Sequence, residues 1–97
     1  MCGIVGVWGG IPDKMAVLAR SRAAMRHRGP DDEGFWEDIE NDLGLAHVRL
    51  SVLDVSHAGH QPMVSACGRY VLVLNGEIYN HLALRELLTI QGQAPDW

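Results

Sequence analysis

The sequence predicts a small α+β domain, and three observations carry that prediction. An apolar, β-rich stretch occupies residues 2–8, and two further strand patterns follow at 35–37 and 43–50. Apolar residues recur at helical spacing in 13–25 and again after residue 80. The 97 residues are enough for one domain with a modest core. We therefore expect a single α+β unit.

A turn and a helix follow the first strand. Two glycines lie inside the strand, and because glycine weakens a strand they indicate a closely packed neighbour. Gly9-Gly10 predicts the turn. Asp13 is expected to cap a helix that runs to about Met25, with arginines toward its C-terminal end, where the helix dipole favours cations.

The charged segment 26–33 predicts a loop, because Gly29-Pro30-Asp31 stops a helix and turns the chain. Strands at 35–37 and 43–50 are then expected around Asn41-Asp42. Arg49 lies near the end of the second strand. The sequence favours neither of two interpretations of this residue. It is either a surface charge or a planar guanidinium fork that binds a carboxylate.

The second half of the chain predicts a hairpin and a second helix. Residues 55–63 are expected to form a loop, and 64–65 and 70–74 a hairpin that places Cys67 at its turn, away from any site. Asn80 is a suitable N-cap for a leucine-rich helix that Gly92 ends.

Composition and charge exclude several classes of partner. The net charge is −4 and the eight basic residues are scattered, which argues against nucleic acid and anionic membranes. No apolar run approaches a membrane span, and no signal peptide is apparent. Two cysteines make no disulfide framework, so we expect a reduced, cytoplasmic protein. The five histidines stand apart along the chain, and we expect no metal site.

Cys2 is the first candidate for chemistry. If Met1 is removed, Cys2 carries a thiol and a free α-amine on one carbon, which pairs a nucleophile with a base. The thiol has an ordinary pKa of about 8.5, and the amine of about 7.7–8.0 can take its proton. The alternative is that the cysteine stands at the second position by accident.

Asn75-Gly76 is the second candidate. A side-chain amide and a glycine N–H side by side can both donate to one oxygen, as in an oxyanion hole. The alternative is a tight hairpin turn, the commonest use of Asn-Gly. Here a helix start follows instead of a partner strand, which weakens that alternative.

Five short motifs stand in order over nearly the whole chain. They are Met1-Cys2-Gly3-Ile4, Arg26-His27-Arg28-Gly29-Pro30-Asp31, Arg49-Leu50-Ser51-Val52, Gly59-His60-Gln61-Pro62-Met63 and Asn75-Gly76-Glu77-Ile78-Tyr79-Asn80. In this order they resemble the motifs of class II glutamine amidotransferases, and most closely those of the glutaminase domain of glutamine-hydrolysing asparagine synthetase.

The resemblance implies a fold and a set of site residues. The fold is the N-terminal-nucleophile hydrolase αββα sandwich, of which residues 1–97 would be the N-terminal half. The catalytic residues carried over are the nucleophile and the oxyanion hole: Cys2, Asn75 and Gly76. The residues carried over for binding L-glutamine are Arg49, Leu50, Val52 and Glu77. Arg49 would hold the α-carboxylate and Glu77 the amino group.

The same resemblance implies the reaction and what this chain would lack. The reaction is glutamine hydrolysis through a Cys2 thioester, with ammonia passed to an ATP-activated aspartate in the full-length protein. This chain would lack the synthetase domain, to which ATP and Mg²⁺ belong. It would also lack a later motif of the glutaminase domain, whose aspartate binds the substrate amine. We expect the chain alone to be inactive because that aspartate is missing. We also expect it to self-associate, because apolar sheet surface would stay uncovered. The alternatives are another ammonia acceptor or a non-catalytic fragment.

Overall fold

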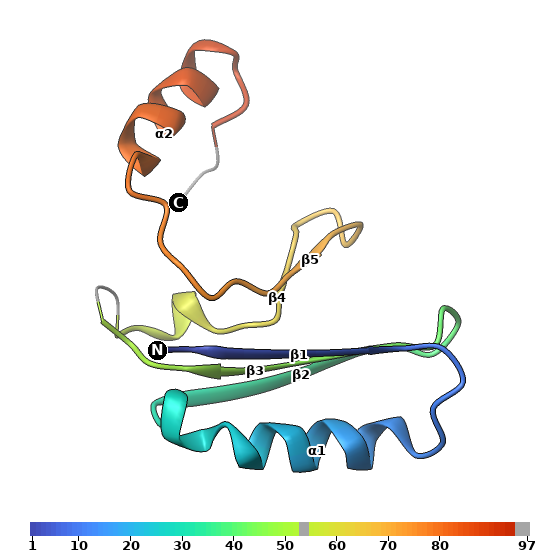
Figure 1. The fold of residues 1–97 in the computed structure, drawn as a ribbon. Coiled ribbons are helices and arrows are strands. Elements are labelled where there is room, and N and C mark those ends of the chain that lie inside the picture. Colours follow the sequence, from blue (N-terminus) through green and yellow to red (C-terminus); the bar gives the residue numbers. More distant parts are fainter. Residues whose placement is uncertain (53–54, 95–97) are drawn as a thin grey trace.

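A three-stranded antiparallel sheet forms the centre of the protein, in a computed structural model that describes residues 1–52 and 55–94. Its strands are β1 (Gly3–Trp8), β2 (Asp32–Asp38) and β3 (Leu43–Arg49), in the order β1-β3-β2. Helix α1 (Lys14–Ala24) packs against one face of this sheet (Figure 1). Because β3 is the middle strand, both of its edges are hydrogen-bonded to neighbours.

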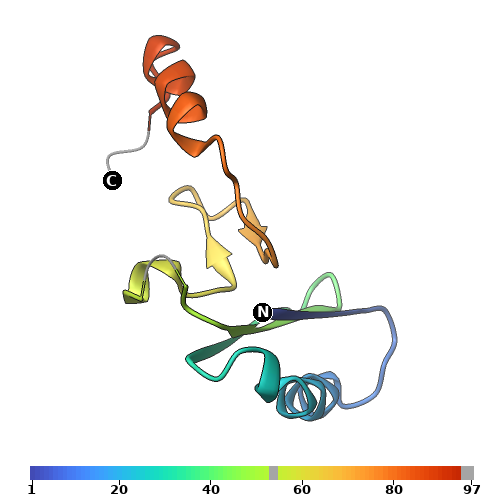
Figure 2. The ribbon, with the colours of Figure 1, turned by 60° about the vertical axis from the view of Figure 1, so that its left-hand side comes forward.

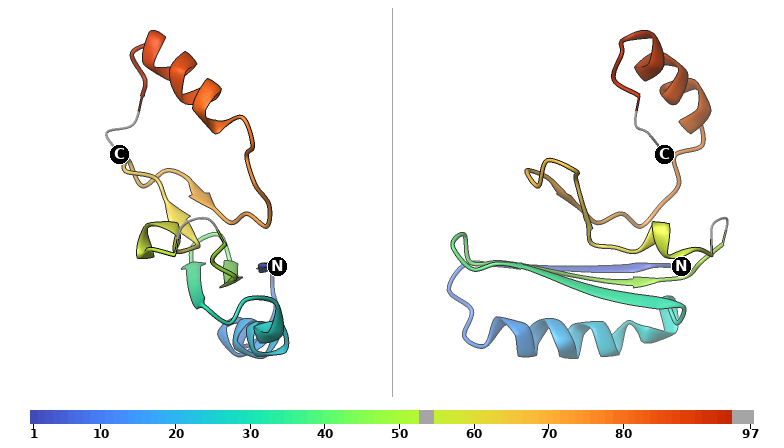
Figure 3. Two further views of the ribbon diagram at one scale, coloured as in Figure 1. Left: turned by 90° about the vertical axis from the view of Figure 1, so that its left-hand side faces the viewer. Right: turned by 180° about the vertical axis from the view of Figure 1, so that it is seen from behind.

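The other face of the sheet carries the second half of the described chain. It contains the short 3₁₀ helix η2 (His57–Gly59), the strands β4 (Met63–Val64) and β5 (Val71–Leu72), and helix α2 (His81–Ile90). The views of Figures 1 and 2 agree that β4, β5 and α2 lie on the side of the sheet opposite α1. Helix α2 buries none of its residues and stands away from the central sheet in Figure 3.

The structure confirms most predicted elements and corrects one. The first strand, both helices, the strand ending at Arg49 and the hairpin are present close to their predicted bounds. The loop predicted at 26–33 is wrong in its second half, because β2 already begins at Asp32. Only the 3₁₀ helix η1 (Arg26–Arg28) and a short link precede it. The predicted tail reaches residues 95–97, which lie outside the described part.

The two predicted caps are right in position only. Asp13 and Asn80 precede the helices, but neither side chain accepts a capping hydrogen bond within the described residues. Asp13 instead has a left-handed backbone, with φ 52° and ψ 53°, and its carbonyl accepts from Ala16 and Val17. The chain therefore turns into α1 through backbone conformation.

The fold class is mixed α/β with antiparallel sheets, as predicted. The complete αββα sandwich stays a prediction. Among the described residues no helix is long and apolar enough to cross a membrane.

The core lies between α1 and the central sheet. Leu18 of α1 and Ala46 and Val48 of β3 are fully buried. A Cβ built on Gly44 would come within 2.5 Å of Leu18 Cδ1, so the absence of a side chain at Gly44 lets the helix approach the sheet. Packing at this contact is what fixes α1 to β3.

Truncating Leu18 should destabilise the domain strongly. Leu18→Ala removes a fully buried side chain, so the free energy of unfolding should fall by about 2–5 kcal/mol. The matched control is Leu82→Ala on α2, where the side chain is 73% exposed and the change should stay within about 0.5 kcal/mol. Urea unfolding followed by circular dichroism measures both. Equal losses in the two variants would contradict this description of the core.

Candidate functional site

The alternation of β3 separates core residues from polar ones. Ala46 and Val48 lie on the α1 side, whereas His47 and Arg49 lie on the opposite face, because successive side chains of a strand point to opposite sides. Contacts confirm this division: His47 Nε2 lies 3.3 Å from the carbonyl oxygen of Leu74, in the second half of the chain. The polar face of the sheet is therefore where the candidate site lies.

The sheet register places Cys2 at the end of this face. Gly3 pairs with Val48, so Cys2 lies beside the last residues of β3. The Leu50 N–H donates to Cys2 Sγ over 3.4 Å, and Arg28 Nε donates to the Cys2 carbonyl oxygen over 3.0 Å. Both the side chain and the backbone of Cys2 are thus held in place.

Arg49 is buried, and this rules out one of its two interpretations. Its exposed fraction is 8%, so the surface-charge interpretation is wrong. Nη1 donates to the Ser56 carbonyl oxygen over 2.6 Å. A Cβ at Gly59 would overlap the Arg49 guanidinium group, so the loop passes this close only because residue 59 is glycine.

Two cavities with five lining residues in common contain the predicted site residues. One, of about 190 Å³, is lined by residues that include Cys2, Arg49, Leu50, Val52, Gly76 and Glu77. The other, of about 270 Å³, shares all of these but Arg49 and adds Asn75, Met1 and Tyr79. The structure therefore brings together all seven residues predicted from the sequence. Their individual roles stay predictions.

No sequence pattern predicted the two contacts that hold Leu74, which lines the cavity shared by Cys2 and Arg49. Gln61 Oε1 accepts from the Leu74 N–H over 2.6 Å, while His47 Nε2 contacts the Leu74 carbonyl oxygen. Leu74 directly precedes Asn75, so these contacts tie the Asn-Gly segment to the central sheet. The alternation of β3 could have placed His47 on the same face as Arg49, but no local pattern identified its partner.

His47 is a buried imidazole in this arrangement. Burial lowers its pKa, and the contact with the Leu74 carbonyl offsets this only in part. Its Nδ1 atom has no hydrogen-bond partner among the residues that the structure describes. His47 is therefore held in its neutral form at neutral pH.

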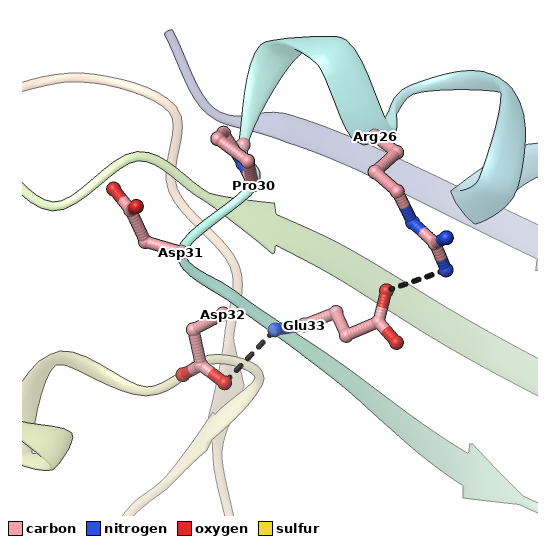
Figure 4. Close-up of a pocket in the computed structure, with 6 residues that line it drawn as sticks. Arg26, Pro30, Asp31, Asp32 and Glu33 are labelled. Carbon is pink, nitrogen blue, oxygen red and sulfur yellow. Dashed lines mark hydrogen bonds and ion pairs between the residues drawn. The ribbon is translucent and has the colours of Figure 1, made fainter.

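A larger cavity of about 470 Å³ lies apart from Cys2, where η1 leads into β2. Figure 4 shows its lining, with the Arg26 guanidinium 3.8 Å from the Glu33 carboxylate and the Glu33 N–H donating to Asp32 Oδ1 over 2.8 Å. Its charged side chains already have partners: Arg26 pairs with Glu33, the Asp31 carboxylate accepts from the Ser51 N–H, and Asp32 pairs with His60. It contains no nucleophile, so we place the candidate site at the Cys2 cavities.

Cys67 lies where the sequence analysis expected it, exposed near the hairpin turn. A hydrogen bond with Ser65, whose Oγ is 3.4 Å from Sγ, and backbone hydrogen bonds lower the pKa of this thiol. It lines neither cavity that contains Cys2.

Known proteins resemble this chain over most of its length. A family model described as a glutamine amidotransferase domain matches residues 1–95. Asparagine synthetase B [glutamine-hydrolyzing] of Escherichia coli is 48% identical over 90 residues, which cover 88% of this chain and 15% of that protein. A putative asparagine synthetase [glutamine-hydrolyzing] of Mycobacterium tuberculosis is 44% identical over 89 residues, 84% of this chain and 14% of that protein.

A third relative, asparagine synthetase [glutamine-hydrolyzing] 1 of Bacillus subtilis, is 37% identical over 97 residues, 95% of this chain and 15% of that protein. The chain thus spans about 14–15% of the length of these three relatives.

Stability should fall as the pH drops below the ordinary pKa of histidine, about 6.5. His47 in the unfolded chain takes up a proton there, while the buried imidazole, with its lowered pKa, does not. Each pH unit should then cost up to about 1.4 kcal/mol, until the folded-state pKa is reached. His47→Gln should flatten this slope, measured by urea unfolding between pH 6.5 and 5, relative to wild type. The exposed variant His27→Gln is the control and should keep the wild-type slope. Equal slopes in His47→Gln and wild type would contradict the proposed buried, neutral His47.

Proposed function

This chain belongs to the family of glutamine amidotransferase domains, and we propose that it performs glutamine hydrolysis with Cys2 as the nucleophile. The observation that carries the proposal is the shared cavity, where the thiol of Cys2 and the guanidinium of Arg49 line one space. Hydrolysis of the side-chain amide of an amino acid needs a nucleophile that attacks the amide and a cation that binds the α-carboxylate.

The first step needs a free α-amine on Cys2. Met1 is 71% exposed and lines the second cavity, and while it is attached the Cys2 nitrogen is an amide that cannot accept a proton. Once Met1 is removed, the amine takes the thiol proton, directly or through one water. The resulting thiolate attacks the side-chain carbonyl carbon of glutamine and forms a tetrahedral oxyanion.

Asn75 and Gly76 are proposed to stabilise that oxyanion through a side-chain N–H and a backbone N–H. The proton from the amine then passes to the nitrogen of the substrate, ammonia leaves, and a glutamyl thioester remains on Cys2. A water molecule attacks the thioester carbonyl, and glutamate is released as the thiol is restored. Support comes from the position of both residues on a cavity that also contains Cys2.

The remaining lining residues are assigned to substrate binding. Arg49 pairs with the α-carboxylate of glutamine, and Glu77 attracts its amino group. Leu50 and Val52 line both cavities beside Cys2 and are assigned to the wall of the binding site. L-Glutamine is thus the proposed substrate.

For the whole protein we propose that the ammonia passes to an aspartate activated by ATP. The support is that several relatives carry the name asparagine synthetase [glutamine-hydrolyzing]. ATP and Mg²⁺ belong to that step, and no residue of this chain is assigned to them.

A diazo-ketone analogue of glutamine should label Cys2 and leave Cys67 unmodified. Only Cys2 lines a cavity with the proposed substrate-binding residues. Peptide mass spectrometry of the full-length protein that carries this chain measures the adduct, which should lie on a peptide that lacks Met1. Iodoacetamide, which does not resemble glutamine, is the control and should modify the exposed Cys67. Equal labelling of both cysteines by the diazo-ketone, or full labelling with Met1 retained, would contradict the mechanism.

Arg49→Lys should raise KM for glutamine by about tenfold or more, with a smaller effect on kcat. Lysine keeps the charge but loses the bidentate geometry, and one charge-assisted hydrogen bond contributes about 1.5–3 kcal/mol. Steady-state ammonia release in the full-length protein measures both constants, and thermal unfolding checks that the variant folds. Arg69→Lys in the exposed hairpin is the matched control and should leave KM unchanged. An unchanged KM in a folded Arg49→Lys protein would remove Arg49 from substrate binding.

A further inference from the structure

Three potential metal ligands meet at one end of the central sheet, although they are far apart in the sequence. They are Asp32 at the start of β2, His57 in η2 and His60 just after it. One ligand atom from each lies within 4.8 Å of the others. The wide spacing of the histidines along the sequence predicted no metal site. In the structure, the loop that contains His57 and His60 returns to β2 and brings these two histidines beside the Asp32 carboxylate.

The cluster is held together by two direct contacts. His60 Nδ1 lies 2.6 Å from Asp32 Oδ2. The rings of His57 and His60 are stacked, with centroids 4.8 Å apart and an interplanar angle of 19°. An ion pair between Asp32 and His60 accounts for two of the three groups, but not for the second imidazole held beside them.

The backbone places His60 firmly against the sheet. A Cβ at Gly34, the next residue of β2 on the same face as Asp32, would come 2.9 Å from two atoms of the His60 ring and would overlap the Gln61 carbonyl oxygen. The absence of a side chain at Gly34 therefore lets the loop lie directly on β2. His57 is exposed and Asp32 and His60 are half-buried, so the three groups are accessible from solvent.

A polar cavity of about 210 Å³ lies beside Asp32 and is lined also by Asp31 and His57, so it has room for water ligands.

We propose that Asp32, His57 and His60 bind a divalent first-row transition-metal ion, with Zn²⁺ as the best match. Two imidazoles and one carboxylate form a ligand set that Zn²⁺ uses with one further position for water. His60 Nδ1 and Asp32 Oδ2 lie 2.6 Å apart and would have to separate by about 0.7 Å, because ligand atoms about 2.0–2.1 Å from a tetrahedral Zn²⁺ ion are about 3.3 Å from each other. The third ligand, His57, is exposed and can turn toward the ion. Arg49 also lines the 210 Å³ cavity, and the carboxylates of Asp31 and Asp32 offset its charge.

A metal ion at this site would fix the position of the loop that contacts Arg49. Ser56, whose carbonyl oxygen accepts from Arg49 Nη1, directly precedes His57, and Gly59 lies against the guanidinium group. An ion bound to His57 and His60 fixes both ends of η2 to β2. The metal therefore holds the segment that positions Arg49, without itself contacting that residue.

The test is a titration of the full chain, prepared without a polyhistidine tag, with Zn²⁺ by calorimetry and with Co²⁺ by absorption near neutral pH. One ion per chain should bind saturably, and the Co²⁺ spectrum should show ligand-field bands without a thiolate charge-transfer band. His57→Asn should weaken binding by more than about tenfold, the lower range of losses for groups that only support a ligand. His57 makes no contact that the fold depends on beyond its stack with His60, so this variant should stay folded by circular dichroism.

His60→Asn and Asp32→Asn should weaken binding as strongly as His57→Asn, and His27→Asn, an exposed histidine in η1, should bind like wild type. Three results would overturn the proposal: no saturable binding, wild-type affinity in His57→Asn, or a thiolate band that assigns the ion to Cys2 or Cys67.

Discussion

The arrangement depends on the two-sided alternation of β3, the middle strand of the central sheet. Ala46 and Val48 point into the core against α1, and the residues between and after them, His47 and Arg49, point into the candidate site. A slip of one residue in the register would exchange these two sets, because side chains alternate with a period of two. It would bury an imidazole and a guanidinium against Leu18 and turn the core outward. The burial of Leu18 therefore determines the position of Arg49, although the two residues lie on opposite sides of the sheet.

The second half of the chain is held to this sheet by polar contacts more than by apolar packing. Both residues of β4 are exposed, and α2 buries none of its side chains. What joins the segment before Asn75 to the sheet is the pair of contacts that Leu74 makes with Gln61 and His47. A hydrogen bond of this kind contributes about 0.5–1.5 kcal/mol. The position of the proposed oxyanion hole thus depends on a few contacts of modest strength.

The sequence predicted the elements that a local pattern of residues determines. It missed the features that depend on contacts between residues far apart in the chain. Periodicity was enough for β1, α1, β3 and α2, since each repeats its apolar residues at its own period. The start of β2 was missed because Asp32 and Glu33 look like a solvated loop. In the structure Glu33 forms ion pairs with Arg22 and Arg26 on the α1 side, and Asp32 pairs with His60 on the other. Motif order and local chemistry were enough to name the seven candidate residues, but the burial of Arg49 and the cluster of Asp32, His57 and His60 arise only when residues 55–61 fold back onto the sheet.

Arg49 is a buried cation next to the candidate site. Removing a guanidinium from water costs several kcal/mol, and the attraction of nearby groups repays this only when the geometry is good. The Ser56 carbonyl oxygen contributes one strong hydrogen bond, and Gly59 gives up its side chain to make room. An apolar residue at this strand position would avoid the free-energy cost of burying a charge. It would also remove the contacts that constrain Ser56 and Gly59. The loop built around this buried cation, beside a cavity that contains Cys2, therefore fits the proposal that the charge binds the carboxylate of a ligand.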